Sequence, residues 1–319
     1  MRPLSSLSLR HLEYFCAVVE AGSISDAAQR LHVSPGGIST ALTQLEARLD
    51  VQLTVRTPGR GVMITPTGRR VYESARAVAA DIEDIQHAAA MMRGELTGTF
   101  HVGFFSTLSP WLFPKIAEHF ATQFPGVDLQ LEESGSETLQ THLLEGNLDA
   151  ALLYENHLIG GIDAHPLLPV RLQLAVSPSH PLARYEAVPL SLLRDEPAVI
   201  LSMRPATDHV EAILREAGMR PNVRWRSANV ETIRSLVARG LGYTIIMGRP
   251  YGDTTYEGMP IVYRPIADEI PPNSLVLATA GGSRPTAKLK ELRAFCENTF
   301  GDVAAHLAPA HQSRMGHLS

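Results

Sequence analysis

The sequence predicts a multidomain α plus α/β protein, with a small helical module, a long heptad-repeat helix and a two-lobed α/β body. Three patterns support this prediction. Residues 24–43 contain two short amphipathic helical patterns, residues 71–92 repeat apolar side chains every 3.5 positions, and strand-like and helix-like segments alternate after residue 100. A chain of 319 residues is long enough for two or three such domains.

Composition is that of a globular protein, with 45% hydrophobic and 19% charged residues. Residues 1–70 hold eight Arg and five Asp or Glu, a charge of +3, whereas the whole chain carries −5, which leaves −8 for the remainder. A basic N-terminal region followed by an acidic remainder fits a nucleic-acid-binding domain attached to a domain with another function. We expect neither a leader peptide nor a membrane span, and the two cysteines, Cys16 and Cys296, suit a reducing cytoplasm.

The first helix is expected at residues 9–21, and it supports two short helices joined by a tight turn. Ser23 and Ser34 stand at the N-caps of the two short helices, and Pro35 occupies a first helical position, where its missing N–H costs nothing. This is the pattern of a helix-turn-helix whose second helix enters a DNA major groove, although an ordinary helical corner has the same pattern. The candidate DNA-binding residues here are Ser23, Ser34, Pro35, Gly36, Gly37, Ser39, Thr40 and Thr43.

A hairpin is predicted next, because residues 53–65 contain two short β-prone runs around Pro58, Gly59 and Gly61. A hairpin that follows a recognition helix is a wing. Arg56 and Arg60 are its candidate phosphate or minor-groove contacts, which completes a winged helix-turn-helix over residues 1–65.

Residues 66–94 are predicted to form a linker helix with a strict heptad stripe, which favours pairing with a second long helix, most simply its copy in another chain. Packing of this helix on its own domain is the alternative. The predicted dimerisation residues are Val71, Ala75, Val78, Ile82, Ile85, Ala89 and Met92.

The body, residues 95–301, is predicted as two α/β lobes around a cleft, followed by a tail over 302–319 without a clear pattern. The order strand, helix, strand, helix, strand over residues 100–153 predicts a parallel, doubly wound sheet. Prolines near 165–169 suggest a break in the regular structure between the two lobes. Lobe 1 is therefore expected over about 95–168 and 270–301, and lobe 2 over 169–269. Ligands in such sheets lie at strand carboxyl ends and helix N-termini, where the chain carries Ser106, Thr107, Ser136, Ser202, Met203, Arg204, Asn229 and Met247.

Some of these ligand candidates have equally simple structural roles. Ser106 or Thr107 would also serve as a helix cap, and Arg204 in a loop is as often solvated. If Arg204 does face the cleft, it would suit a carboxylate.

The whole chain resembles the LysR-type transcriptional regulators. The matching phrases are LRHLEYFCAVVEAGSISDAAQRLHVS, LEARLDVQLTVRT, RGVMITPTG, LEGNLDAAL, SPSHPLA, DEPAVIL and SLVARGLGY, at the expected intervals over about 300 residues. The resemblance implies a homodimer or homotetramer that binds double-stranded operator DNA with a T-N11-A core. It also implies a small-molecule effector in a domain like the type II periplasmic binding proteins, and RNA polymerase as a candidate partner.

The recognition helix departs from the family pattern. Relatives commonly read Ser-Gln-Pro-(Ala/Ser) with an Arg shortly after, whereas this chain reads Ser-Pro-Gly-Gly with Thr40 at the Arg position. Gln and Arg are long donors suited to base edges. We therefore hypothesise that this protein relies more on its wing, thymine methyl groups and DNA shape.

Three other functions fit the sequence less well. An enzyme is disfavoured, because the chain has no Gly-rich phosphate loop, HExxH or GxSxG motif. A solute-binding protein fits the body but not the winged module, and a DNA organiser without an effector would be excluded by a metabolite response. We expect no cofactor and no metal.

Overall fold

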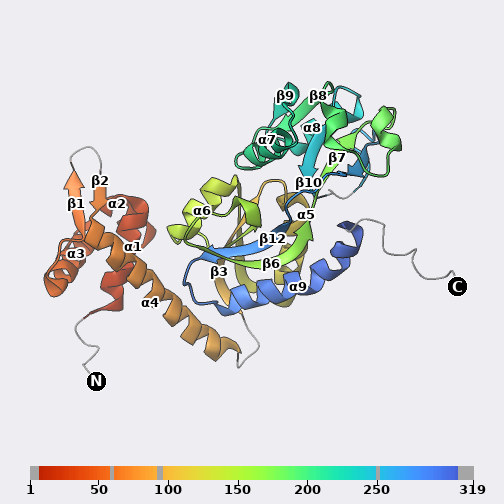
Figure 1. Ribbon diagram of the computed structural model, residues 1–319. Coiled ribbons are helices and arrows are strands. Elements are labelled where there is room, and N and C mark those ends of the chain that lie inside the picture. Colours follow the sequence, from red (N-terminus) through yellow and green to blue (C-terminus); the bar gives the residue numbers. More distant parts are fainter. Residues whose placement is uncertain (1–6, 58–60, 92–95, 249–251, 308–319) are drawn as a thin grey trace. The chain divides into compact units, whose positions relative to one another are not determined.

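The computed structural model describes residues 7–57, 61–91, 96–248 and 252–307. The chain divides into two units, residues 1–94 and 95–319, which are described separately (Figure 1). Among the described residues, no helix is both long and apolar enough to cross a membrane.

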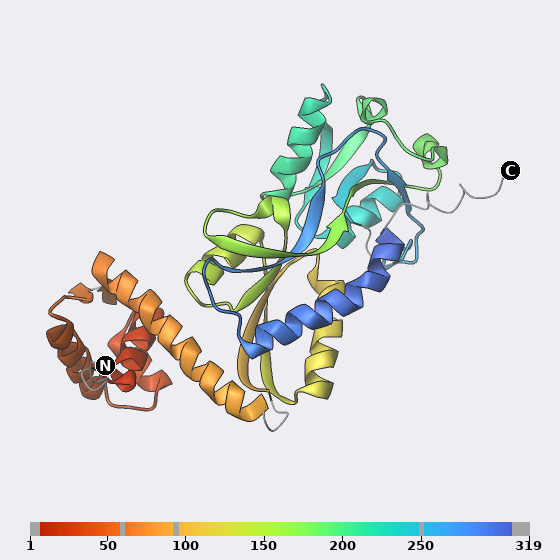
Figure 2. The ribbon, with the colours of Figure 1, turned by 60° about the horizontal axis from the view of Figure 1, so that its bottom comes forward.

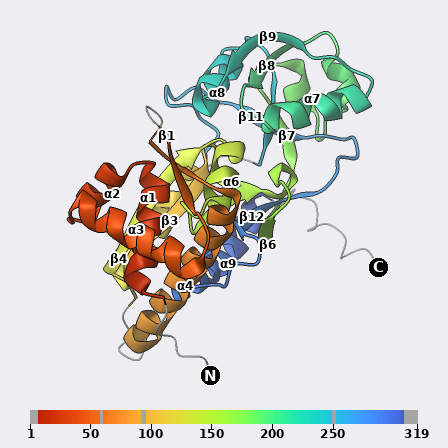
Figure 3. The same cartoon turned by 90° about the vertical axis from the view of Figure 1, so that its left-hand side faces the viewer.

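The first unit is a three-helix module with a β-hairpin and one long helix (Figure 3). Its core is formed by large side chains such as Phe15, Ile38, Leu45 and Leu53, all 0% exposed. The amphipathic spacing seen in the sequence therefore corresponds to one buried face on each helix. The elements are α1 (Leu9–Ala21), α2 (Ile24–Arg30), α3 (Pro35–Leu49), β1 (Thr54–Thr57), β2 (Gly61–Ile64) and α4 (Pro66–Met91).

The hairpin is fixed to the end of α1. Val62 N–H donates to the Gly22 carbonyl oxygen over 2.8 Å, and a Cβ on Gly61 would lie only 2.4 Å from that oxygen. Gly61 also has a φ of +73°. A side chain here would therefore clash with the Gly22 oxygen and would also require a backbone conformation that only glycine adopts readily. This glycine lets the hairpin approach the helical module closely.

Helix α4 packs on α1 through its first turns. Tyr72 is 9% exposed and meets Phe15 edge-on at 6.5 Å, and Ala75 is buried beside it. On α1, Glu20 accepts a hydrogen bond from Tyr72 and pairs with Arg76 and Arg30, over 3.4, 3.3 and 2.9 Å. The first part of the heptad stripe therefore serves packing within the module.

The second unit begins with a five-stranded sheet in the order β4-β3-β5-β12-β6. Strands β3, β4 and β5 are parallel, and β12 is antiparallel to β5 and β6. Helices α5 and α9 lie side by side along this lobe (Figure 2). Its elements are β3 (Thr97–Phe105), α5 (Ser109–Gln123), β4 (Gly126–Ser134), α6 (Ser136–Leu144), β5 (Ala150–Tyr154), the 3-10 turn η2 (Glu155–His157), β6 (Ile162–Val170), β12 (Asn273–Ala280) and α9 (Ala287–Leu307).

The second lobe has its own hydrophobic core, around Leu174, Val176 and Leu190. Strands β7, β10 and β11 form an antiparallel sheet, and β8 pairs in parallel with β9. The chain enters this lobe from β6 to β7 and returns from β11 to β12. Its elements are β7 (Leu172–Val176), η3 (Pro181–Arg184), η4 (Leu190–Leu193), β8 (Pro197–Leu201), α7 (Ala206–Glu216), β9 (Asn222–Ser227), α8 (Val230–Ala238), β10 (Thr244–Met247) and β11 (Val262–Pro265).

Two details of the sequence prediction were wrong, and a third is confirmed in part. The region near 165–169 is part of strand β6, which tolerates Pro166 and Pro169 because it is the edge strand of the sheet. The parallel arrangement predicted from residues 100–153 is confirmed for β3, β4 and β5, and the returning strand β12 runs antiparallel, so the complete sheet is mixed. Helix α9 continues to Leu307, past the predicted start of the tail, and residues 308–319 lie outside the described part.

Candidate nucleic-acid interface and ligand cavity

Helix α3 presents a small, uncharged surface at its N-terminal half. Gly36, Gly37, Thr40 and Thr43 are exposed, whereas Ile38 on the opposite face is fully buried. The lack of side chains at two successive positions leaves backbone accessible, and a Cβ on Gly36 would meet nothing within 4 Å. The surface is therefore suited to close backbone approach by a bulky partner.

Hydrogen bonds fix the polar groups of this surface. Ser34 caps α3 by accepting from Gly37 N–H over 3.1 Å, and Ser23 caps α2 by accepting from Asp26 N–H over 3.4 Å. The Thr40 hydroxyl donates to the Gly36 carbonyl oxygen over 2.9 Å, and the Thr43 hydroxyl to that of Ser39 over 3.0 Å. These caps confirm the predicted helix starts, and Pro35 lies at the first position of α3.

The predicted wing is present as an antiparallel hairpin, with Thr54 opposite Ile64 and Arg56 opposite Val62. The Arg56 side chain and all of Arg60 lie outside the described part of the structure. Their contacts with DNA stay predictions.

The second unit contains a cavity of about 80 Å³ between its two lobes. Space of this size accommodates several water molecules or a small organic molecule. Phe105, Trp111 and Tyr154 line it from the first lobe, and Val199, Leu214 and Ile245 from the second. Met203 and Ala206 of the second lobe also pack against the first-lobe core.

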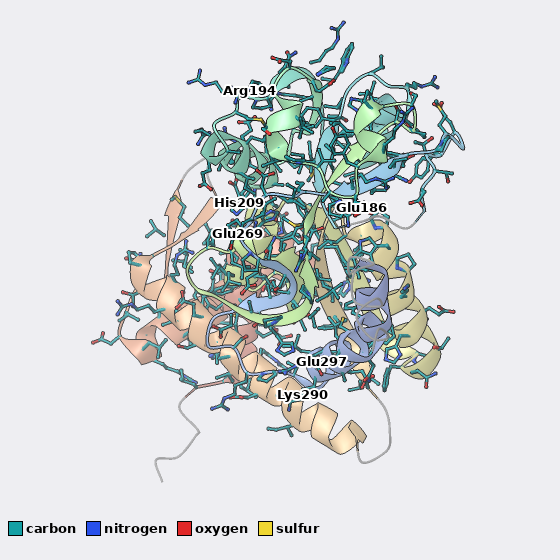
Figure 4. All side chains as sticks on the ribbon, turned by 45° about the vertical axis from the view of Figure 1, so that its right-hand side comes forward. Glu186, Arg194, His209, Glu269, Lys290 and Glu297 are labelled. Carbon is teal, nitrogen blue, oxygen red and sulfur yellow. The ribbon has the colours of Figure 1, made fainter. Side chains whose placement is uncertain are left out.

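Polar side chains gather where the two lobes meet in this cavity. His157 contacts Tyr154 and Phe105 edge-on, at ring-centroid distances of 5.4 and 5.2 Å. His209 on α7 approaches His157 at 6.3 Å. Figure 4 shows His209 at the end of the second lobe nearest the first lobe, whereas Arg194 lies at the far end. Thr107 completes the group, since it also lines the cavity.

His157 is held in its neutral form by its surroundings. Burial, together with a smaller contribution from nearby His209, lowers its pKa from 6.5 to about 4. Its Nδ1 atom lies 2.8 Å from the Ser136 hydroxyl, and Gln140 donates to its carbonyl oxygen over 2.9 Å. Ser136 thus contacts His157 and does not itself line the cavity.

Two hydroxyl groups among the cavity-lining residues are buried without a hydrogen-bond partner in the described part: Thr107 Oγ1 and Tyr243 Oη. The Tyr154 hydroxyl donates to the Met247 carbonyl oxygen over 3.4 Å. Burial raises the Tyr154 pKa to about 12, and nearby Thr107 opposes that rise. A buried hydroxyl without a protein partner is costly unless water or a ligand bonds to it, so Thr107 and Tyr243 are candidate contacts for a bound molecule.

Of the predicted ligand-binding residues, only Thr107 and Met247 line the cavity. The Ser106 hydroxyl donates to the Ser134 carbonyl oxygen over 3.2 Å. Arg204 has a 76% exposed side chain and lies 3.6 Å from Asp208. Ser202 is exposed, and Asn229 caps α8 by accepting from Glu231 and Thr232 N–H over 2.9 and 3.1 Å.

Sequence reasoning missed Tyr154, His157, His209 and Tyr243. A usable pattern existed for the first two, because Tyr154 ends the buried strand β5 and His157 lies in the 3-10 turn directly after it, at a strand carboxyl end. His209 lies within the predicted helix, and no local pattern distinguishes it from a surface histidine.

A second concave surface lies between α1 and α4 of the first unit. Leu9 is 56% exposed, Val78 36% and Ile85 70%, and the groove is lined by Leu9, Leu12, Val78 and Ile82. The side chains of α4 among them, Val78, Ile82 and Ile85, continue the heptad stripe beyond the packed residues Val71 and Ala75. The side chain of Ala89 and all of Met92 lie outside the described residues.

A capped helix-turn-helix with a wing, joined to a two-lobed α/β body with an internal cavity, defines the class of ligand-binding transcriptional regulators. Residues 9–69 match the model of the bacterial regulatory helix-turn-helix proteins of the lysR family, and residues 93–301 match the LysR substrate binding domain. The chain belongs to the LysR family and is a DNA-binding transcriptional regulator with an effector-binding domain.

Individual similar proteins are regulators of the same family. The chain is 30% identical over 241 residues to the transcriptional dual regulator OxyR of Escherichia coli, covering 75% of this chain and 79% of OxyR. HinK, a LysR family regulator from Pseudomonas aeruginosa, matches with a TM-score of 0.60 and 28% identity over 92% of this chain and 99% of HinK. A full-length OxyR variant from Pseudomonas aeruginosa shares the fold, with a TM-score of 0.72 and 24% identity over 91% and 97% of the two chains.

Proposed function

We propose that this LysR-type regulator binds a two-fold symmetric operator through the exposed face of α3 and responds to a small molecule in the cavity of its body. The observation that supports the DNA role most directly is the exposed Gly36, Gly37, Thr40 and Thr43 surface on the second helix of the helix-turn-helix. Its lack of long donors favours contacts with thymine methyl groups and with the DNA backbone.

We infer that two chains pair through the apolar surface of α1 and α4. The apolar side chains Leu9, Val78 and Ile85 are exposed on these two helices, and Leu9 and Val78 line the same groove, as apolar surface at a protein interface does. A dimer built on this surface carries two recognition helices, so half-sites about one helical turn (~34 Å) or a multiple apart are expected. Assembly into a tetramer and contact with RNA polymerase fit the family.

Effector control follows from the location of the cavity. A molecule that contacts both lobes stabilises one lobe arrangement, and it changes DNA binding only by its difference in affinity for the two arrangements. The Ser136 hydroxyl lies 2.8 Å from His157 Nδ1, but Ser136 is fully buried and does not line the cavity, so this pair is not placed to attack a bound molecule. We therefore propose binding without catalysis, in the cytoplasm, where operator DNA is accessible.

Several relatives are named hydrogen peroxide-inducible genes activators. We do not extend a thiol-based peroxide response to this chain. Burial raises the pKa of Cys16 to about 11 and that of Cys296 to about 12, so both of its cysteines are far from the reactive thiolate form at neutral pH. Neither lines the cavity.

Selection of binding sites from a random-sequence DNA library tests the proposed function. We expect the purified protein to enrich an inverted repeat, and the Thr40→Ala variant to lose about 1 kcal/mol or more at one position per half-site. A control variant, Thr141→Val, alters an exposed threonine of the body and should enrich the same repeat. Enrichment of no motif by the wild-type protein would contradict the proposal.

A further inference from the structure

We propose that the effector is an uncharged, mainly apolar small molecule with one hydroxyl or carbonyl group, which bonds to Thr107 in the cavity between the lobes. This inference rests on the proposed function and specifies the ligand class of the same cavity. It differs from the carboxylate ligand that the sequence suggested.

The residues that line the cavity indicate that the ligand is mainly apolar. Its lining includes the aromatic rings of Phe105 and Trp111 and the aliphatic side chains of Val199, Leu214 and Ile245. Several of these side chains are core residues, since Leu214 is 1% and Val199 0% exposed. A charged group placed among them would lose its hydration without compensation.

The charges of the lining residues also argue against an anionic ligand. Among the described lining residues there is no Lys, Arg, Asp or Glu. Arg204, the predicted partner of a carboxylate, lies on an exposed turn beside Asp208 instead. Arg249 follows the lining residue Gly248 and lies outside the described part, so a variant at this position belongs to the test.

The polar end of the ligand is specified by the groups that lack partners. Thr107 Oγ1 is buried and makes no hydrogen bond of ordinary geometry within the described structure, and its side chain lies close enough to the Tyr154 hydroxyl to oppose the rise in the pKa of Tyr154. A hydroxyl or carbonyl on the ligand satisfies Thr107 without introducing charge. Tyr243, the second buried hydroxyl without a partner, lines the same cavity from the other lobe.

Three probes of nearly equal size separate the possibilities: toluene, benzyl alcohol and benzoate. Trp111 lines the cavity and the chain has only one other tryptophan, Trp225, which is 43% exposed. Fluorescence titration in a Trp225→Phe background therefore reports on the cavity. At about pH 7.5, where benzoate is ionised, we expect saturable changes with toluene and benzyl alcohol, and binding of benzoate at least about tenfold weaker.

Variants at Thr107 test the polar contact. Thr107→Val should weaken benzyl alcohol about fivefold, the range of one hydrogen bond, and leave toluene unchanged. Thr107→Ser keeps the hydroxyl and should retain benzyl alcohol affinity, while Thr141→Val serves as a threonine control outside the cavity. Equal loss of both probes in a folded Thr107→Val protein would overturn the assigned contact.

Other outcomes would overturn the ligand class. If benzoate binds as tightly as benzyl alcohol, and Arg249→Gln removes that binding, the ligand is an anion held by Arg249. If benzoate binding survives that change, the cavity tolerates charge and the proposal is equally wrong. If no probe changes Trp111 fluorescence up to its solubility, the cavity is not a site for such molecules, whereas operator selection would still decide the DNA-binding function.

Discussion

At the scale of single residues, His157 shows how burial of a polar group makes stability depend on pH. Its pKa is lowered to about 4 in the folded protein, against 6.5 when exposed, so the unfolded chain binds more protons between these values. The stabilisation is complete above about pH 6.5 and is lost as the pH falls toward 4.

This shift predicts a measurable loss of stability in mild acid. Between about pH 7.5 and pH 5, His157 should account for a loss of about 2 kcal/mol in the free energy of unfolding of the second unit. The His157→Gln variant should be less stable at neutral pH but show a flatter dependence, as measured by urea denaturation at several pH values. An unchanged pH dependence in this variant would refute the assignment.

Variants at Gly36 and Gly37 would distinguish a structural role of the small α3 surface from a role in DNA binding. Gly36→Ala adds a methyl group into open space and should stabilise the first unit by up to about 1 kcal/mol through helix propensity. If the backbone approaches DNA here, the same change should weaken operator binding. Gly37→Ala is the comparison, because its Cβ would lie 3.2 Å from the capping Ser34 hydroxyl.

Thermal unfolding and DNA-binding titrations of these two variants check the prediction. Increased stability with unchanged operator affinity for Gly36→Ala would mean that the small surface of α3 does not approach the DNA closely.

At the scale of elements, the sequence was sufficient wherever a local pattern determines the structure. The caps Ser23 and Ser34 and the heptad of α4 are local, and their helices begin as predicted. Strand β6 was missed because Pro166 and Pro169 are tolerated only at a sheet edge, and edge position depends on the distant strand β12. The cavity was only partly foreseen because segments from Phe105 to Gly248 converge on it.

The apolar stripe of α4 yields a prediction about assembly. Ile85→Glu places a charge where the side chain is 70% exposed in the single chain. The fold should therefore keep its stability, whereas a dimer that buries Ile85 should weaken by at least about 2 kcal/mol. Sedimentation equilibrium checks this, with Glu73→Gln, an exposed change outside the stripe, as control; an unchanged association constant would exclude this face.

At the scale of the whole molecule, binding of DNA and binding of ligand are assigned to different units. A Thr40→Ala, Arg60→Ala double variant should lose operator binding and retain ligand-induced changes in Trp111 fluorescence. Thr107→Val should do the reverse, retaining operator binding with a weakened response to benzyl alcohol. Loss of both activities in either folded variant would show that the division between the units is wrong.

The most direct test is a nuclease footprint of the purified protein on the intergenic DNA beside its own gene. The account predicts a protected inverted repeat with a T-N11-A core, weakened by Thr40→Ala. Protection should fall steeply as salt is raised, because phosphate contacts release counterions. Absence of any protection at low salt, where electrostatic attraction is strongest, would contradict the central claim that this chain is an operator-binding regulator.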